Sequence, residues 1–324
     1  MNSDTTSKKM DVCCNPVPII LDTDIGPDCD DAGAVAVLHA LARSGEAEIV
    51  GMFHCTSSRW GAGCLDALNL FYGREDIPVG TLETAGFLDD DSQYARYNKW
   101  VAVGYPNRFD GKAAAPAAVA LYRTLLAQQE DGRVVITAIG PLLNLMNLLQ
   151  SVPDEASELS GIELIRRKAA KLVVMGGAFP EGKDWNFEMH PEAAAYVMEH
   201  WPTPVVLAGS EIGKAMLTGG SLAALEVLRH PVRDAYEWFT SGSGLRESWD
   251  LAAVLYAVRG ASAYWHEQRG TIRVLPDGGN IWEPDSGGWH AYLTFKASPQ
   301  EVAETLDELL AAMPESAETA AGSC

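Results

Sequence analysis

"LDTDIGPDCDDAGAVAVL" (residues 21–38) places five aspartates within ten residues and then becomes apolar with helical periodicity. It directly follows the apolar segment "PVPII" (residues 16–20). An apolar run, a polar break and a helical pattern in this order predict a buried strand that leads into a helix. Carboxylates this close together repel one another unless a cation neutralises them. We therefore expect an acidic site between the strand and the helix, built from Asp22, Asp24, Asp28, Asp30 and Asp31.

Strand-like and helix-like runs continue to alternate along the chain. The strand-like runs are mostly continuous apolar segments, which is typical of a parallel sheet covered by helices on both faces. The sequence predicts one doubly wound α/β domain with a mainly parallel sheet at residues 17–312, between a flexible N-terminus (1–16) and a flexible tail (313–324). Residues 88–112 show no period and predict a long loop over the site. The expected strands include "AEIVGMFHCTS" (47–57), "RVVITAIG" (133–140), "AAKLVVMGGAF" (169–179) and "TPVVLAGSE" (203–211).

The composition restricts the partners of the protein. The 324 residues are 47% hydrophobic and 21% charged, as in soluble globular proteins. A formal net charge of −20 repels phosphate backbones, so we expect no nucleic-acid partner. No apolar stretch is long enough to span a bilayer, so we expect no membrane partner. The six cysteines form no CxxC pair and the N-terminus has no apolar signal region, so we expect a cytoplasmic protein with reduced thiols.

Ligands of open parallel sheets bind outside the carboxyl ends of the strands, so the residues that follow each strand are the candidates for the site. Most of them carry oxygen ligands, and oxygen ligands without paired histidine or cysteine favour Ca²⁺ or Mg²⁺ over zinc. The structural alternative is that Asp30 or Asp31 caps the following helix and that Asp250 stabilises the start of its own helix. Besides the aspartates above, the candidates are Ser58, Thr137, Asp184, Asn186, His190, Ser210, Glu211 and Asp250.

Other catalytic motifs are absent from the sequence. There is no GxxxxGK[ST] phosphate loop, no GxGxxG spacing and no GxSxG nucleophile elbow. Among the seven histidines, His54 follows a strand and is expected to be packed or hydrogen-bonded. His190 and His290 are better placed for a functional role.

Five segments together resemble one family. "IILDTDIGPDCDDAGAVAVL" (19–38) resembles the N-terminal signature of the inosine–uridine-preferring nucleoside hydrolases, in which a strand is followed by Asp-x-Asp-Pro-Gly-x-Asp-Asp-Ala and an apolar helix. The further matches, in order, are "TAIGPLLNL" (137–145), "VVMGGAF" (173–179), "WNFEMHPEAA" (185–194) and "SWDLAAVL" (248–255). The resemblance implies a doubly wound α/β enzyme, a homodimer or homotetramer, that uses Ca²⁺ to hydrolyse the N-glycosidic bond of ribonucleosides or related N-ribosides.

The resemblance also implies roles for individual residues. Asp24 resembles the general base that also binds the metal, and Asp30 resembles the acid that binds a ribose hydroxyl. Asn186 would hold the sugar, with Asp184 in place of the usual glutamate. The implied metal ligands are Asp24, Asp31, Asp250 and the backbone carbonyl of Thr137.

Several positions depart from the family pattern. The acidic loop is two residues longer than usual, so Asp28 is extra and could either displace a metal ligand or face solvent. Trp249 stands where purine and pyrimidine hydrolases place the histidine that protonates the leaving base, and an indole is a donor only. His290, Glu211 and His190 are the alternative proton donors. Ser58 is a candidate for the ribose contact, because the usual asparagine after the second strand is missing.

Two other functions fit parts of the pattern. A haloacid-dehalogenase-type phosphatase is one, because "DTDIG" (22–26) resembles Asp-x-Asp-x-Thr, although Gly26 replaces the threonine. A non-catalytic binder of pentoses or nucleosides is the other, since Trp249 could mark the loss of the leaving-group acid while the metal site is kept.

Overall fold

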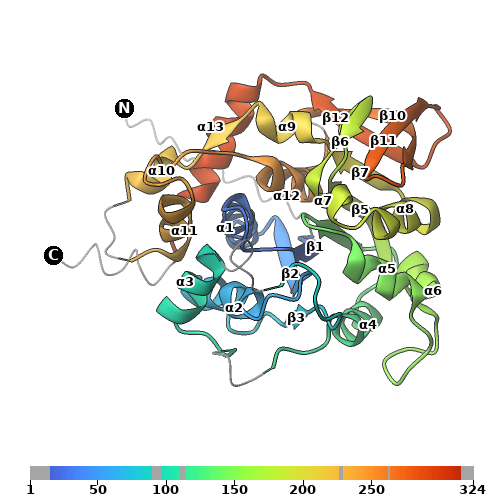
Figure 1. The fold of residues 1–324 in the computed structure, drawn as a ribbon, viewed down its shortest axis with the longest axis horizontal. Coiled ribbons are helices and arrows are strands. Elements are labelled where there is room, and N and C mark those ends of the chain that lie inside the picture. Colours follow the sequence, from blue (N-terminus) through green and yellow to red (C-terminus); the bar gives the residue numbers. More distant parts are fainter. Residues whose placement is uncertain (1–14, 90–95, 110–113, 226–228, 262, 315–324) are drawn as a thin grey trace, which may run out of the picture.

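A mainly parallel sheet organises the protein. The computed structural model describes residues 15–89, 96–109, 114–225, 229–261 and 263–314, and within them ten strands form one sheet (Figure 1). Seven neighbouring strands are parallel, and the last three pair antiparallel at one edge. In spatial order the strands are β3 (Val79–Thr81), β2 (Ala47–His54), β1 (Val17–Thr23), β4 (Val134–Ala138), β5 (Ala169–Met175), β7 (Val205–Ala208), β12 (His290–Phe295), β10 (Trp265–Val274), β11 (Gly279–Pro284) and β6 (Glu181–Lys183).

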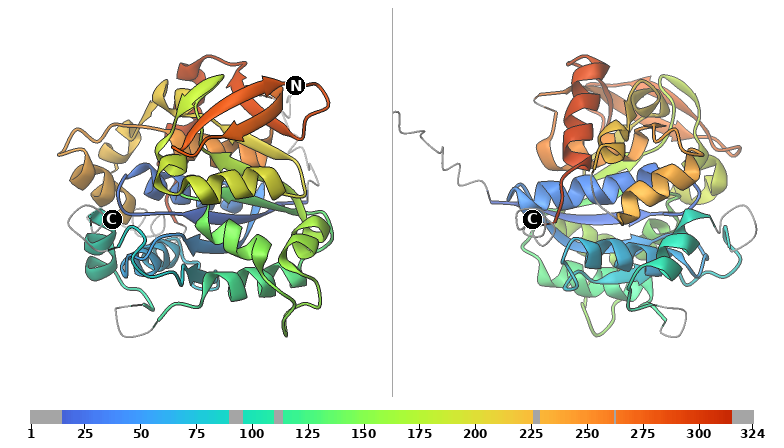
Figure 2. Two further views of the ribbon diagram at one scale, coloured as in Figure 1. Left: turned by 45° about the vertical axis from the view of Figure 1, so that its right-hand side comes forward. Right: turned by 90° about the vertical axis from the view of Figure 1, so that its left-hand side faces the viewer.

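Helices cover both faces of this sheet, as Figure 2 shows. Successive residues of β1 point to opposite faces, so Leu21 joins one apolar cluster and Ile20 joins the other. The fold is therefore doubly wound, as the alternating pattern predicted. The Leu21 cluster includes residues of α1 (Asp30–Arg43), α2 (Gly61–Phe71), α11 (Pro231–Phe239), α12 (Trp249–Arg259) and α13 (Pro299–Leu310), and the Ile20 cluster includes residues of α4 (Ala118–Gln128), α5 (Leu143–Gln150), α6 (Gly161–Lys168) and α8 (Pro191–His200).

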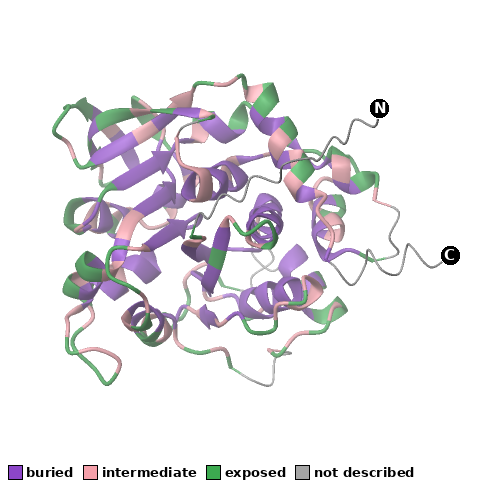
Figure 3. Ribbon diagram, turned by 180° about the vertical axis from the view of Figure 1, so that it is seen from behind, coloured by how far each residue is buried: buried purple, intermediate pink, exposed green. Residues whose placement is uncertain are grey.

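The helix that follows the acidic stretch lies at the centre of the molecule. Every residue of α1 from Asp30 to Leu41 is buried, and Figure 3 shows this helix and the central strands in the colour of buried residues. Small side chains make this possible. A Cβ atom at Gly33 would lie 2.9 Å from Leu251 Cδ1 and 2.4 Å from Tyr236 Oη, so α11 and α12 could not approach α1 as closely with a larger residue.

Two parts of the fold differ from the sequence predictions. The expected loop at 88–112 contains the helix α3 (Tyr97–Gly104), because Tyr97, Val101 and Ala102 form a buried face; residues 90–95 and 110–112 lie outside the described residues. No individual element was assigned from the sequence after residue 260, where β10, β11, β12 and α13 form. The short elements are α7 (Trp185–Met189), α9 (Ser210–Lys214), α10 (Gly220–Ala223), β8 (Leu217–Thr218) and β9 (Arg246–Glu247).

None of the helices in the described ranges is long and apolar enough to cross a membrane.

Candidate active site

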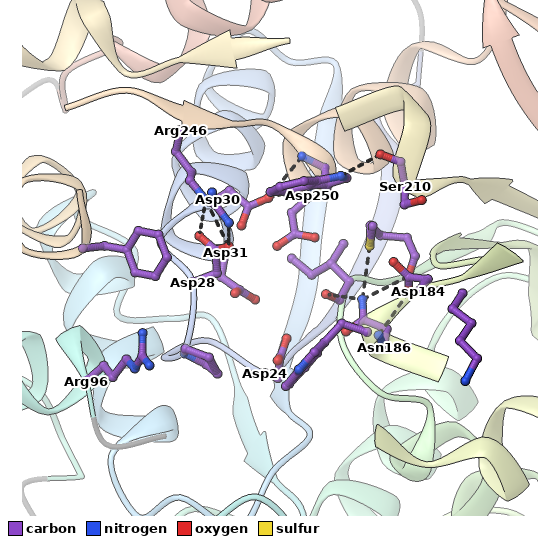
Figure 4. Close-up of a pocket in the computed structure, with 17 residues that line it drawn as sticks. Asp24, Asp28, Asp30, Asp31, Arg96, Asp184, Asn186, Ser210, Arg246 and Asp250 are labelled. Carbon is purple, nitrogen blue, oxygen red and sulfur yellow. Dashed lines mark hydrogen bonds and ion pairs between the residues drawn. The ribbon is translucent and has the colours of Figure 1, made fainter. Parts of the chain in front are cut away.

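A pocket of about 450 Å³ opens at the carboxyl ends of the parallel strands. It lies near β1, where the sheet order reverses, since β2 and β3 extend from one side of β1 and β4, β5 and β7 from the other. Ligands of doubly wound proteins bind at such switch points. The lining residues include Asp24, Asp28, Asp30, Asp31, Arg96, Ile139, Met175, Lys183, Asp184, Trp185, Asn186, Ser210, Phe239, Arg246, Trp249 and Asp250 (Figure 4).

Three carboxyl groups form the tightest acidic cluster. Asp30, Asp31 and Asp250 are buried and offer ligand oxygens that all lie within 4.8 Å of one another. Burial, and then the negative charge of neighbouring aspartates, raises the pKa of each carboxyl well above its usual range. A cation between these carboxylates would offset both the cost of burying their charge and their mutual repulsion, so the cluster could hold a metal ion.

Asp30 joins the first turns of two helices. One oxygen of its carboxylate, Oδ2, accepts hydrogen bonds from the backbone N–H groups of Trp249 and Asp250, each at 3.1 Å. These groups are unpaired donors at the N-terminus of α12, where negative charge is favourable. Asp30 is therefore a capping residue, as the structural alternative proposed, but it caps α12 rather than its own helix. Its neighbour Asp31 accepts a hydrogen bond from the Thr23 hydroxyl.

Asp24 lies at the end of β1 and lines the pocket. Burial is the main reason that the pKa of its carboxyl is raised to about 7, and the charge of Asp28 adds to the effect. Asp22 is two residues earlier but is not among the lining residues. Its carboxylate accepts hydrogen bonds from Tyr122 Oη at 2.8 Å and Asn144 Nδ2 at 3.0 Å, so it ties β1 to α4 and α5.

Asp184 and Asn186 form one side of the pocket, which we call the Asp184 side (Figure 4). The Asn186 side chain donates to the carbonyls of Met175 at 3.1 Å and Ile139 at 3.3 Å. Asp184 accepts the backbone N–H of Asn186 at 3.0 Å. Burial raises the pKa of Asp184 to about 7. The ends of β4 and β5 therefore fix the Asn186 side chain, and the N–H of Asn186 in turn holds Asp184.

Asp28 and Arg246 lie on the opposite side, the Arg246 side (Figure 4), and Phe239 and Trp249 belong to it because Arg246 lies over their rings. Arg246 Nε donates to Asp28 at 2.9 Å, and its Nη1 donates to Glu247 at 2.7 Å. Its guanidinium lies over the rings of Trp249 at 4.8 Å and Phe239 at 5.0 Å. The extra aspartate of the long loop is thus held by an arginine that sequence analysis did not single out.

Trp249 uses its single side-chain donor within the protein. Its indole Nε1 donates to the carbonyl oxygen of Ser210 at 2.8 Å. The ring is held close to α9, since a Cβ atom at Gly213 would lie 2.4 Å from the indole. Trp249 therefore lines the pocket with its aromatic surface rather than with a polar group.

Three further candidate residues, Thr137, Glu211 and Ser58, are not among those that line the pocket. Thr137 lies inside β4, which pairs with β1 and β5 at this residue, while Ile139 two residues later does line the pocket. Glu211 accepts the N–H of Phe179 at 3.3 Å. Ser58 accepts the N–H of Trp60 at 3.3 Å.

The two histidines expected to be functional have structural contacts. His290 lies in β12, where Nδ1 accepts the N–H of Ile272 at 3.2 Å and Nε2 is 3.1 Å from the Met198 carbonyl. Burial lowers its pKa. His190 caps α8, because its Nδ1 accepts the N–H of Ala193 at 3.0 Å. Neither imidazole is among the groups that line the pocket.

The missed pocket residues are Arg96, Ile139, Met175, Lys183, Trp185, Phe239 and Arg246. Ile139 and Met175 are apolar residues at the ends of strands, and their main-chain carbonyls are the groups that contact Asn186. Phe239 and Arg246 lie on either side of a glycine-rich turn in the segment 239–247, which shows no periodic pattern. Nothing in the sequence therefore indicated that this turn lies beside the carboxyl ends of the predicted strands.

Comparison with known proteins gives a consistent assignment. Residues 19–307 match the family described as inosine-uridine preferring nucleoside hydrolase. A non-specific ribonucleoside hydrolase, RihC, from Klebsiella pneumoniae is 28% identical over 265 residues, which cover 75% of this chain and 79% of that protein.

Solved structures share the fold. A purine-preferring ribonucleoside hydrolase from Gardnerella vaginalis superimposes with a TM-score of 0.66 at 18% identity, covering 90% of this chain and 98% of that one. The type III effector protein XopQ, solved with adenosine diphosphate ribose, gives a TM-score of 0.63 at 15% identity, covering 91% and 94%. The family match spans most of the chain, so the protein belongs to the inosine-uridine preferring nucleoside hydrolase family and is an enzyme that hydrolyses N-glycosidic bonds.

Proposed function

We propose that this enzyme uses Ca²⁺ to hydrolyse the N-glycosidic bond of ribonucleosides or related N-ribosides. The observation that carries the proposal is the buried cluster of Asp30, Asp31 and Asp250 in a pocket that Asp24 also lines. The family match and the relatives named as ribonucleoside hydrolases support the same reaction. The family match also disfavours the phosphatase, and ribose release would separate a hydrolase from a non-catalytic relative that keeps the metal site.

The residues present fit a calcium ion. The cluster offers only carboxylate oxygens, which are the ligands that Ca²⁺ prefers, and no histidine or cysteine lines the pocket among the described residues. Asp24, Asp31 and Asp250 would hold the ion, together with a main-chain carbonyl from the end of β4. Thr137 is the carbonyl that the resemblance implies, and Ile139 is the one next to the pocket. When bound, Ca²⁺ would supply positive charge that lowers the pKa of the attacking water.

The chain's own residues would divide the remaining work. Asp24 would accept the proton of the attacking water, as a carboxylate general base. Asp30 would accept a hydrogen bond from a ribose hydroxyl, and Asp184 with Asn186 would hold the sugar from the other side of the pocket. Positive charge develops on the sugar as the glycosidic bond breaks, and the surrounding carboxylates would stabilise it.

We also propose that the enzyme is a cytoplasmic homo-oligomer. Three cysteines of the described residues, Cys29, Cys55 and Cys64, are buried free thiols, which fits a reducing compartment. The dimer or tetramer follows from the family resemblance. Sedimentation of the purified protein at several concentrations would measure the oligomeric state.

Turnover of a panel of ribosides tests the proposal. The purified enzyme is expected to release free ribose from at least one nucleoside or from 4-nitrophenyl riboside when Ca²⁺ is present. Adding a chelator should stop the release, and Ca²⁺ should restore it. Binding without ribose release from any of these compounds would contradict the proposed function.

A further inference from the structure

The pocket provides no evident acid for a leaving base. Among the described residues that line it, there is no histidine, tyrosine or cysteine. The only side-chain N–H of Trp249 donates a hydrogen bond to the carbonyl oxygen of Ser210. An indole does not act as a general acid near neutral pH. The remaining acidic groups in the pocket are carboxyl groups.

Most of these carboxyl groups are held as acceptors. Asp30 accepts two backbone N–H groups, Asp184 accepts that of Asn186, and Asp28 accepts the Arg246 guanidinium. Asp31 accepts the Thr23 hydroxyl, and Asp24 is the proposed base. Each of these hydrogen bonds favours the ionised form of the carboxyl group that accepts it. Such a pocket suits a leaving group that needs no proton.

The charge of the pocket lining indicates which class of leaving group fits the pocket. Six carboxyl groups and three cationic side chains line the pocket, a formal excess of three negative charges that one divalent ion reduces to one. Two of the cations are already paired, since Arg246 binds Asp28 and Glu247, and Lys183 lies 3.3 Å from Glu188 and 3.2 Å from Asp277. The excess negative charge would attract a cationic substrate and disfavour an anionic one.

The aromatic side chains of the pocket also favour a cationic substrate. Trp185, Phe239 and Trp249 line the pocket, and the last two already hold a guanidinium over their rings. Aromatic faces attract cations, whether from a side chain or from a ligand. Asp184 and Asn186 would hold the sugar on one side, so the base would extend toward the opposite side, where the carboxyl groups of Asp28 and Asp30 lie (Figure 4).

We propose that the preferred substrates are N-ribosides whose glycosidic nitrogen already carries a positive charge, such as ribosyl pyridinium compounds or 7-alkylated purine ribosides. This inference rests on the proposed function. As the bond between the sugar carbon and the nitrogen breaks, its electron pair neutralises the ring nitrogen, and the base leaves without taking up a proton. The water oxygen bonds to the sugar carbon, and Asp24 accepts the water proton. Neutral nucleosides such as guanosine would need a proton donor for the base, and among the described residues that line the pocket no histidine, tyrosine or cysteine supplies one.

A matched substrate pair tests the inference. We would measure kcat/KM for 7-methylguanosine and for guanosine, which differ in one methyl group and one charge, in the parent and in Trp249→His. General acid catalysis is typically worth about 10²–10⁴-fold. The parent should prefer 7-methylguanosine by at least about 10²-fold, and Trp249→His should reduce this preference by about tenfold or more by speeding guanosine. An equal rate on both substrates in the parent, or a preference unchanged in Trp249→His, would overturn the inference.

Binding to the parent enzyme provides a second measurement that needs no variant. 1-Methylnicotinamide, a pyridinium cation, should inhibit at a concentration about tenfold or more below that of neutral nicotinamide, and the difference should shrink as salt screens the pocket charge. Equal inhibition by the two compounds would overturn the inference. Hydrolysis of 4-nitrophenyl riboside distinguishes failure of this inference from failure of the proposed function. If it is hydrolysed while the cationic compounds show no advantage, only the substrate class is wrong. If no riboside is hydrolysed, the proposed function itself fails.

Discussion

The Asp184 side and the Arg246 side of the pocket are built in different ways. Asn186 is fixed by main-chain carbonyls at the ends of β4 and β5, which belong to the sheet, and Asp184 is held by the N–H of Asn186. Asp28 and Arg246 are fixed by each other and by two aromatic rings, on segments outside the large sheet. Under the proposed function, the sugar contact of Asn186 would depend on the sheet, whereas contacts to the leaving group would depend on segments outside it.

Metal removal should give the largest effect, because Asp30, Asp31 and Asp250 would then repel one another without compensation. We expect a chelator to abolish turnover and Asp31→Ala to reproduce the loss. A ligand at a hundredfold excess over its Kd stabilises the folded state by about 3 kcal/mol, so the parent should lose several degrees of Tm in chelator. Thermal melts with Ca²⁺ and with chelator measure this. Asp31→Ala should melt at the same temperature in both; a retained Ca²⁺ shift in this variant would place the ion elsewhere.

Asp24→Asn should give the next largest effect. Asparagine keeps the size of the side chain but cannot accept the proton of the attacking water, and a general base contributes about 10²–10⁴-fold. We expect kcat on 4-nitrophenyl riboside to fall by that factor. A fall smaller than tenfold would assign the base to another carboxylate on the same pocket. Isothermal titration with Ca²⁺ would show how far metal binding contributes to the change.

The Asp184 side should produce a pH dependence. Burial raises the pKa of Asp184 to about 7, so under the proposed function the group would bind sugar as a carboxylate mainly above this pH. A bound cation would lower the pKa of Asp24, because it favours the charged form. We expect kcat/KM on 4-nitrophenyl riboside to rise about tenfold from pH 6 to a plateau above pH 7, since about one group in ten is ionised one unit below its pKa.

The matched control is Asp184→Asn. Its pH profile should be flat between pH 6 and pH 8, at a value below the parent plateau. An unchanged profile in this variant would mean that a different group titrates near pH 7.

The Arg246 side should give the smallest effect. Asp28 and Arg246 are about one-quarter exposed, and the worth of such ion pairs is about 1 kcal/mol, or less than tenfold in rate or binding. We expect Asp28→Ala to change kcat/KM on 4-nitrophenyl riboside by less than about tenfold and to leave the Ca²⁺-dependent shift in Tm intact. If Asp28→Ala is as damaging as Asp31→Ala, the distinction between the two sides is wrong.

The parts of the site that the sequence predicted are those set by periodicity. Asp24, Asp30 and Asp31 follow a strand and precede a helix, and Asp250 begins an apolar helix, so their positions at the sheet edge follow from chain geometry. Which partner each carboxylate has was not predictable. That Asp30 caps α12 rather than α1, and that Asp28 meets Arg246, depends on contacts between residues more than 200 positions apart.

For the same reason, the contacts of His290 could not be predicted from the sequence. His290 follows two glycines and a tryptophan and therefore resembles a loop residue, but strand β12 places it between β10 and β7, where its ring binds backbone groups. In contrast, Trp249 was placed in the pocket through its neighbour Asp250. A residue beside the predicted start of a helix can be located from the sequence. A residue in a strand that the sequence analysis did not assign cannot.

The contact between Asp30 and the start of α12 also concerns the order in which the protein folds. The two partners are 219 and 220 residues apart, and such long-range contacts form slowly because a long loop must close first. During synthesis the N-terminal aspartates leave the ribosome long before their partner helix exists. Asp30 can cap α12 only after residues 249 and 250 have been made, so we expect the pocket to assemble after the N-terminal strand and helix.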